Sequence, residues 1–306
     1  MRWQIKAFSQ KLISFLPWSY KLNYLAQNYF TVGDNLPDEF VFEKIKASLF
    51  HLENLKFQPN PRKINLSILE VGTGWYPLVP LFFYLNGFEN IILFDKRKLY
   101  NNNSLRKTIL AIEKMYEKKI LQKEFDYFDE NRYFKLLKLK GVGDIEQGLI
   151  NLGIRSCFGS LSTVENLKID FVVSNNTIQF ISLSNLERLV SKLSEIIHED
   201  GLISFSIDLT DEFSHSDKSL SKFNFLKYSK IGWYIVTNRL NRPRRTMYSQ
   251  YKFIFEKNFA IIHENLTKLD VGELHKIKVN REFNAFALEE LRISIFDLVL
   301  IKLKVD

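Results

Sequence analysis

Residues 69–83, LEVGTGWYPLVPLFF, join a short apolar run to a helix-like apolar segment through a turn that contains two glycines. Glycines in a strand-to-helix turn let the backbone approach a ligand, and the helix N-terminus that follows favours negative charge. A dinucleotide-binding turn places a third glycine where this chain has Pro77. Proline is compatible with the first turn of a helix, because its missing N–H is not needed there. The stretch therefore predicts an intact turn that is adapted to a ligand other than a pyrophosphate.

Two carboxylates end the first two predicted strands. Glu70 ends the first strand, where it would repel a pyrophosphate but suits a cationic ligand with an amino group. Asp95 ends the second strand, where it is placed to accept hydrogen bonds from ribose hydroxyls. S-adenosylmethionine combines a ribose, an adenine, an ammonium group and a sulfonium without any phosphate. The two acids therefore point to this cofactor.

The sequence resembles the class I S-adenosylmethionine-dependent methyltransferases in three places: the glycine motif at residues 70–74, the acid Asp95, and the segment DFVVSNNTIQFI at residues 170–181. Residues 208–229 and 238–259 are similar to a bacterial small-molecule subgroup with a helical cap after the fifth strand. The resemblance implies an α/β, Rossmann-like sheet of seven strands whose last strand is antiparallel. It also implies S-adenosylmethionine as the cofactor and methyl transfer to the oxygen or nitrogen of a small molecule.

The pattern of apolar runs predicts helices in the first sixty or so residues and alternating strands and helices after them, which is typical of a parallel sheet. Gly87 and Gly201 are expected to follow the ends of two of these helices. The predicted strands are residues 64–71, 90–95, 153–158, 169–175, 202–208, 259–269 and 293–305; the predicted helices are residues 35–55, 77–86, 104–120, 183–197 and 245–258, with a helical connection at 121–150. The predicted parts are an N-terminal helical segment (1–62), a cofactor-binding core (63–208), a cap with the acceptor site (209–245), and a C-terminal helix with the closing strands of the core (246–306).

Composition narrows the class of protein. Apolar residues make up 46% and charged residues 25% of the chain, which is ordinary globular usage and argues against extensive disorder. Cys157 is the single cysteine, so no intramolecular disulfide and no multi-cysteine metal site can form, and the histidines show no metal-ligand spacing. A reducing, cytoplasmic setting is expected. No apolar run approaches the roughly 18 residues that cross a bilayer, and the basic, amphipathic residues 1–25 are interpreted as helix rather than signal.

The net charge of +8 raises the hypothesis of a nucleic-acid partner. Lysine and asparagine are abundant along the whole chain, which indicates a compositional bias rather than a basic patch built for phosphate. A small-molecule acceptor is therefore preferred over nucleic acid. The chain is expected to be a monomer or a homodimer, with Trp3, Phe15 and Trp18 forming either a dimer face or a cover for the core.

Residues after the fifth strand are predicted to form the acceptor site. His215 is close in sequence to Asp208, Asp211 and Asp217, and a carboxylate that fixes its tautomer would suit it to act as a general base for a hydroxyl. The alternative is an exposed polar histidine in a cap helix. An aromatic and arginine-rich cluster follows; arginine forks suit a carboxylate or phosphate, so an anionic acceptor is one hypothesis and a solvated basic face is the other.

Each candidate residue receives one expected role. His215 and Asp208 are the candidate catalytic residues, and no metal site is predicted. The expected cofactor-binding residues are Glu70, Gly72, Thr73, Gly74, Trp75, Asp95, Lys96, Ser174 and Asn175. The expected acceptor-binding residues are Tyr76, Asn176, Asp211, Trp233, Tyr234, Asn238, Arg239 and Arg242. Simple packing of Trp75 and Tyr76 against the N-terminal helices is the alternative for these two side chains.

The chain also departs from the pattern of the family. Gln179 and Phe180 stand where such enzymes often carry a Glu-His pair, which puts the usual acceptor chemistry in doubt. Residues 175–178, Asn-Asn-Thr-Ile, lack the Asn/Asp-Pro-Pro-aromatic run that suits an exocyclic or amide nitrogen, and Cys157 is interpreted as a small buried residue rather than a nucleophile. The alternatives are an RNA methyltransferase or a non-catalytic binding protein with the methyltransferase fold. A nicotinamide-dependent dehydrogenase is the least favoured alternative.

Overall fold

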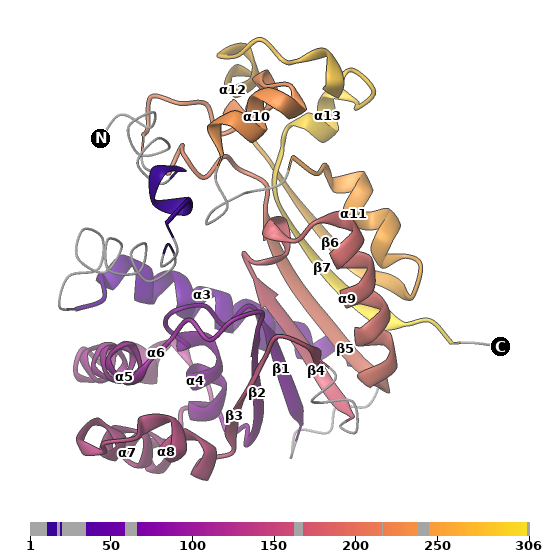
Figure 1. The fold of residues 1–306 in the computed structure, drawn as a ribbon. Helices are drawn as coiled ribbons and strands as arrows, with labels where there is room; N and C mark the ends of the chain where they lie inside the picture. Colours follow the sequence, from indigo (N-terminus) through magenta and orange to yellow (C-terminus); the bar gives the residue numbers. More distant parts are fainter. Residues whose placement is uncertain are drawn as a thin grey trace.

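The computed structural model describes residues 11–16, 19, 35–58, 66–161, 168–215, 217–237 and 245–304. At its centre is a seven-stranded sheet with the order β3-β2-β1-β4-β5-β7-β6 (Figure 1). Strands β1 to β5 pair in parallel, whereas β7 is antiparallel to both β5 and β6. The predicted Rossmann-like methyltransferase sheet with an antiparallel last strand is confirmed. The strands are β1 (Ser67–Val71), β2 (Asn90–Asp95), β3 (Ile154–Phe158), β4 (Ile169–Asn175), β5 (Ile197–Asp208), β6 (Phe259–Lys268) and β7 (Ile293–Lys302).

Helices cover both faces of the sheet, and the alternation of side chains along each strand divides the buried residues into two clusters. Ile68 of β1 packs with α3 and α4, on what we call the α3 face, whereas Leu69 packs with α9 and α11, on the α9 face. Both faces are apolar because a parallel sheet is buried on both sides. The helices are α3 (Asp38–Asn54), α4 (Leu78–Leu85), α5 (Asn102–Glu117), α6 (Ile120–Glu124), α7 (Glu130–Lys138), α8 (Ile145–Asn151), α9 (Leu183–Ile196) and α11 (Tyr248–Phe255).

Helix α3 lies across the strands and follows one row of paired residues. His51 Nδ1 is 2.7 Å from the Ser204 hydroxyl of β5, and Lys44, seven positions earlier, interacts electrostatically with Glu70 of β1. Seven helical residues rise about 10.5 Å, close to the roughly 9.6 Å between strands two apart, so one helix serves both contacts. Burial lowers the pKa of His51 to about 3, so its ring is neutral. The row consists of Glu70, Val173, Ser204, Val299 and His263.

The expected boundary at Gly201 is wrong. Helix α9 ends at Ile196, and β5 begins directly at Ile197, so Gly201 lies inside the strand. The pairing of β4 with β5 shifts register just there, between Ile169 and Phe171. A Cβ at Gly201 would lie 2.9 Å from the His198 carbonyl oxygen, which shows that glycine serves the close approach of a β-bulge rather than a helix end.

A cap stands at the carboxyl end of the sheet and is built from two segments that are distant in sequence (Figure 1). The first segment contains η6 (Asn224–Lys227) and α10 (Lys230–Val236) and has no strand among its described residues, as predicted. The second, between β6 and β7, contains α12 (Val271–His275), η7 (Arg281–Phe283) and α13 (Leu288–Leu291). The predicted C-terminal part, residues 246–306, includes this second segment together with the closing strands of the core. The two segments share a buried cluster of Phe213, Phe223, Phe225, Leu226, Trp233, Met247, Leu274, Phe283 and Leu291.

Part of the N-terminal segment reaches the cap. Residues 11–14 are helical, and the Lys11 ammonium donates to the carbonyl oxygens of Tyr234 and Ile235. Phe15 is exposed, whereas Trp3 and Trp18 lie outside the described residues. Within the part of the chain that the structure describes, no helix is both long and apolar enough to span a bilayer.

Candidate functional site

The turn between β1 and α4 has the conformation that its glycines allow. Gly72 has φ +92° and Gly74 has φ +72°, both in the region that favours glycine. The Gly72 N–H donates to the Phe94 carbonyl at 2.8 Å, which ties the turn to β2. A Cβ on Gly72 would lie 2.1 Å from the Thr177 hydroxyl oxygen, so the backbone and Thr177 approach too closely for any side chain. Pro77 is the residue before α4, which begins at Leu78, one position after the predicted start.

Asp95 is held at the end of β2 by backbone donors. Its Oδ2 accepts from the Gly74 N–H at 3.2 Å, and its Oδ1 accepts from the Arg97 N–H at 3.3 Å. Burial raises the pKa of Asp95, and these backbone hydrogen bonds partly oppose that rise. The carboxylate is therefore positioned beside the glycine turn with lone pairs left to accept from a hydroxyl pair.

A cavity of about 510 Å³ opens at the carboxyl ends of β1 to β4, on the α9 face. Of the expected cofactor residues, Gly72, Asp95 and Lys96 line this cavity. The other residues of its wall were not predicted from the sequence. Ligands of open α/β sheets bind at the carboxyl edge, so residues that directly follow a predicted strand could have been named as candidates. The unpredicted residues of the wall include Gly159, Ser160 and Leu161 after β3, Thr177 and Phe180 after β4, and Asn185 and Arg188 of α9.

Glu70 lies on the α3 face and does not line the cavity. Glu70 is only 5% exposed, and its Oε2 has no hydrogen-bond partner among the described residues. Burial raises the pKa of Glu70 to about 7, while the nearby Thr73 hydroxyl and the charge of Lys44 oppose that rise. A buried carboxylate oxygen without a donor is costly, and a ligand ammonium group would satisfy it.

The remaining expected cofactor residues differ in their surroundings. Ser174 is completely buried, and its hydroxyl donates to the Val71 carbonyl at 2.8 Å, so it joins β4 to β1 and has no surface for a ligand. Asn175 is half-buried at the end of β4. Trp75 is half-buried in the turn, and Tyr76 packs edge-on against Phe40 of α3 with ring centroids 6.2 Å apart. The contact of Tyr76 with α3 agrees with the packing alternative, and its role as an acceptor contact stays a prediction.

The candidate catalytic pair is brought together at the end of β5. His215 Nε2 lies 3.7 Å from Asp208 Oδ2 and 3.1 Å from the Thr210 hydroxyl. The His215 side chain is 55% exposed, so the ring is open to an incoming molecule. Asn176, exposed with φ +52°, donates its N–H to the Ser206 carbonyl at 3.0 Å and begins the turn beside this group.

Two expected acceptor residues belong to the interior of the cap. Asp211 is 1% exposed and accepts from the Phe213 N–H and the Asn224 side-chain amide, at 2.8 and 2.9 Å. Trp233 is buried, with ring centroids 6.3 Å from those of Phe213 and Phe225. Both side chains pack inside the cap, and their roles as acceptor contacts stay predictions. Tyr234 is exposed on α10, whereas Asn238, Arg239 and Arg242 lie outside the described residues.

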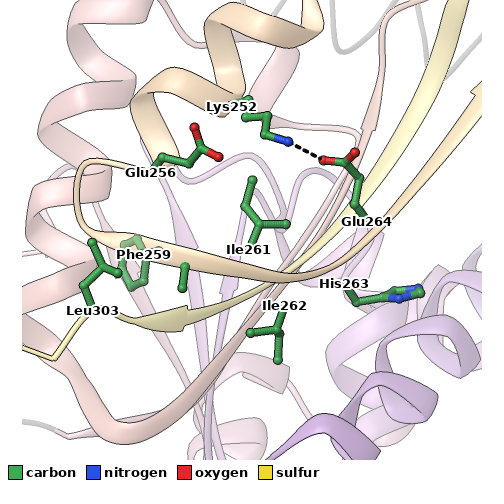
Figure 2. Close-up of a pocket in the computed structure, with 9 residues that line it drawn as sticks. Lys252, Glu256, Phe259, Ile261, Ile262, His263, Glu264 and Leu303 are labelled. Atoms are coloured by element: carbon green, nitrogen blue, oxygen red, sulfur yellow. Dashed lines mark hydrogen bonds and ion pairs between the residues drawn. The ribbon is translucent and has the colours of Figure 1, made fainter.

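The structure also places the single cysteine and a second hollow. Cys157 is buried and donates its thiol to the Ser160 carbonyl, which agrees with a structural role. Within the described ranges, no group of three or more His, Cys, Asp and Glu side chains is arranged to hold a metal ion. A second hollow of about 550 Å³ lies along edge strand β6, where Lys252 pairs with Glu264 at 3.2 Å (Figure 2). It is four strands from β1 in the sheet and so does not belong to the site at the glycine turn.

No family model and no curated protein matches the sequence. Among solved structures, the chain is similar to the magnesium protoporphyrin IX methyltransferase of Synechocystis PCC 6803 at 10% identity, with 93% of this chain and 95% of that one covered and a TM-score of 0.43. It is similar to the N-methyltransferase NodS of Bradyrhizobium japonicum WM9 at 8% identity, with 94% and 97% covered and a TM-score of 0.42. An S-adenosylmethionine-dependent methyltransferase of Clostridium acetobutylicum ATCC 824 shows 11% identity, 84% and 90% coverage and a TM-score of 0.43. The chain's own strand order and strand directions define its fold as a Rossmann-like sheet of seven strands with an antiparallel β7.

Proposed function

We propose that this protein is a methyltransferase that uses S-adenosylmethionine and methylates a small molecule at oxygen or nitrogen. The observation that carries the proposal is the arrangement around the glycine turn. Gly72 closes the turn against Thr177, Asp95 lines the cavity, and Glu70 presents a buried oxygen that has no partner in the described part of the chain. These three features fit a ribose, an adenine and an ammonium group, and none of them favours a pyrophosphate.

Each part of the site has a separate task in this proposal. Asp95 would bind the ribose hydroxyls, the cavity would hold the adenine, and Glu70 would bind the amino group of the cofactor. The bound cofactor supplies an electrophilic methyl group. Since methyl transfer is an in-line displacement, the main task of the chain is to align the acceptor. His215, oriented by Asp208, would take the proton from an acceptor hydroxyl.

Asp95→Asn is expected to weaken the binding of S-adenosylhomocysteine by roughly 10- to 100-fold, the effect of losing one or two charge-assisted hydrogen bonds. Titration calorimetry with S-adenosylmethionine, S-adenosylhomocysteine and NAD measures this directly. Asp126→Asn removes an exposed carboxylate elsewhere and should bind like the unmodified protein. Tight binding of NAD, or equal affinities in both variants, would refute the proposed cofactor site. Tight adenosyl binding without turnover of any acceptor would favour a non-catalytic binding protein.

His215→Asn is expected to lower kcat by roughly 100-fold and to leave the affinity for S-adenosylhomocysteine unchanged, because the ring serves the acceptor and not the cofactor. Release of S-adenosylhomocysteine with an identified acceptor gives kcat. His275→Asn, an exposed cap histidine, is the matched control. An unchanged kcat in His215→Asn would mean that the acceptor needs no base from the chain.

A further inference from the structure

One row of paired residues on the α3 face is polar across four neighbouring strands. Ser206 of β5 follows Ser204, which contacts α3, by two positions, so its side chain points to the same face. Its neighbours Phe205 and Ile207 are buried on the α9 face. This row lies two residues nearer to the carboxyl edge of the sheet than the row of Ser204, which α3 contacts. It spans about 14 Å across its four strands, because adjacent strands are about 4.8 Å apart. It consists of Asn175 (β4), Ser206 (β5), Asp297 (β7) and Asn265 (β6).

Much of the hydrogen-bonding capacity of this row is available to a ligand. The Asn265 amide donates to Asp297 Oδ2 at 3.2 Å, which fixes the carboxylate and leaves Oδ1 without a partner among the described residues. Within the same part of the chain, the side chains of Asn175 and Ser206 have no hydrogen-bond partner either. Asn175, Ser206 and Asp297 are half-buried, so a bound group would be partly shielded from water. Such shielding strengthens any charged contact that forms there.

The charge of this surface is negative. Asp208 lies two positions beyond Ser206 on β5, beside His215, so a second carboxylate stands next to the row. Glu70, on the same face of β1, adds little to this charge, because burial raises its pKa to about 7 and the positive charge of Lys44 lies close to it. Neither the row nor the paired residues Asp208, Ile295 and Thr267 beyond it include a lysine or arginine. A carboxylate with a free oxygen is a strong acceptor for a protonated amine.

We infer that the methyl acceptor carries a cationic amine and that Asp297, held by Asn265, is the residue that binds it. This inference rests on the proposed function, because the row is the half-buried polar surface next to Asp208 and His215. It reverses the charge expected from the arginine cluster, whose residues Arg239 and Arg242 lie outside the described part of the chain. The amine bound by Asp297 need not be the atom that receives the methyl group.

Two matched sets of small fragments test the inference on the full chain, saturated with S-adenosylhomocysteine: aryl and alkyl ammonium compounds, and carboxylates with the same carbon skeletons. Amide resonances of Asn175, Ser206 and Asp297 report binding. The ammonium set is expected to shift these resonances and the carboxylate set is not. Asp297→Asn should weaken the ammonium fragments by roughly tenfold or more, whereas Glu53→Gln, which removes an exposed carboxylate of α3, should not change them.

The outcomes separate this inference from the proposed function. Three results would overturn the inference: carboxylate fragments shift the resonances of the row, Asp297→Asn leaves the affinity for ammonium fragments unchanged, or neither set shifts these resonances. S-adenosylhomocysteine is followed at the resonances of Gly72 and Asp95. If it fails to bind while the ammonium fragments still bind the row, the cofactor proposal fails and the cationic site stands. If S-adenosylhomocysteine binds and the ammonium fragments do not shift the resonances of the row, only the inference of a cationic site fails.

Discussion

Gly72→Ala is expected to lower the free energy of unfolding by about 2–5 kcal/mol and to remove measurable binding of S-adenosylhomocysteine. A non-glycine residue at φ +92° costs about 1–2 kcal/mol, and overpacking adds about 1–3 kcal/mol, because the new Cβ would lie 2.1 Å from the Thr177 hydroxyl. Relief of that contact must displace Thr177 or the turn, and both line the cavity. Urea denaturation measures the stability, and calorimetry measures the affinity.

Gly74→Ala provides the matched control for this variant. Gly74 also has a positive φ, +72°, but a Cβ there would meet nothing within 4 Å. Its expected cost is therefore the backbone contribution alone, about 1–2 kcal/mol. If the two variants lost the same stability, the contact between Gly72 and Thr177 would not be what requires glycine, and the account of the turn would be wrong.

Glu70→Gln is expected to remove a large pH dependence of stability. Burial raises the pKa of Glu70 from 4.5 to about 7, so the folded protein holds this proton more tightly than the unfolded chain. The stabilisation is complete below pH 4.5 and is lost as the pH rises to about 7, a change of about 3 kcal/mol. Urea denaturation across this pH range should show the fall in the unmodified protein and a flatter profile in Glu70→Gln.

Ligand binding gives a second readout of the same carboxyl. An ammonium group that binds Glu70 favours its charged form, so binding of S-adenosylhomocysteine near pH 7 should release a proton. Calorimetry in buffers of different ionisation enthalpy counts that proton, and Glu70→Gln should abolish its release. Glu53→Gln, on the exposed face of α3, should match the unmodified protein in both experiments. The same pH profile in both variants would exclude Glu70 as the titrating group.

Local sequence was sufficient for most of the sheet. Strands β2 and β4 have the predicted bounds, because buried parallel strands are continuous apolar runs between turn residues. The glycine turn and Asp95 were also predictable, because a close backbone approach and a carboxylate at a strand end each produce a recognisable pattern in a few adjacent residues. The polar residues of α3 form no such local pattern. His51 is an ordinary helix residue in the sequence, and only Ser204, on a distant strand, explains why it is buried.

The sequence alone thus determined the class of fold, the glycine turn that lines the cavity, and the acids that end β1 and β2, because each depends on short-range periodicity and backbone conformation. The tertiary structure decided what depends on contacts between distant residues. It placed Thr177 against Gly72, completed the cap with the segment between β6 and β7, and buried Asp211 and Trp233 inside that cap. It also aligned Ser206 with Asp297, since strand order and register are set by packing of the whole sheet and not by any local run of residues.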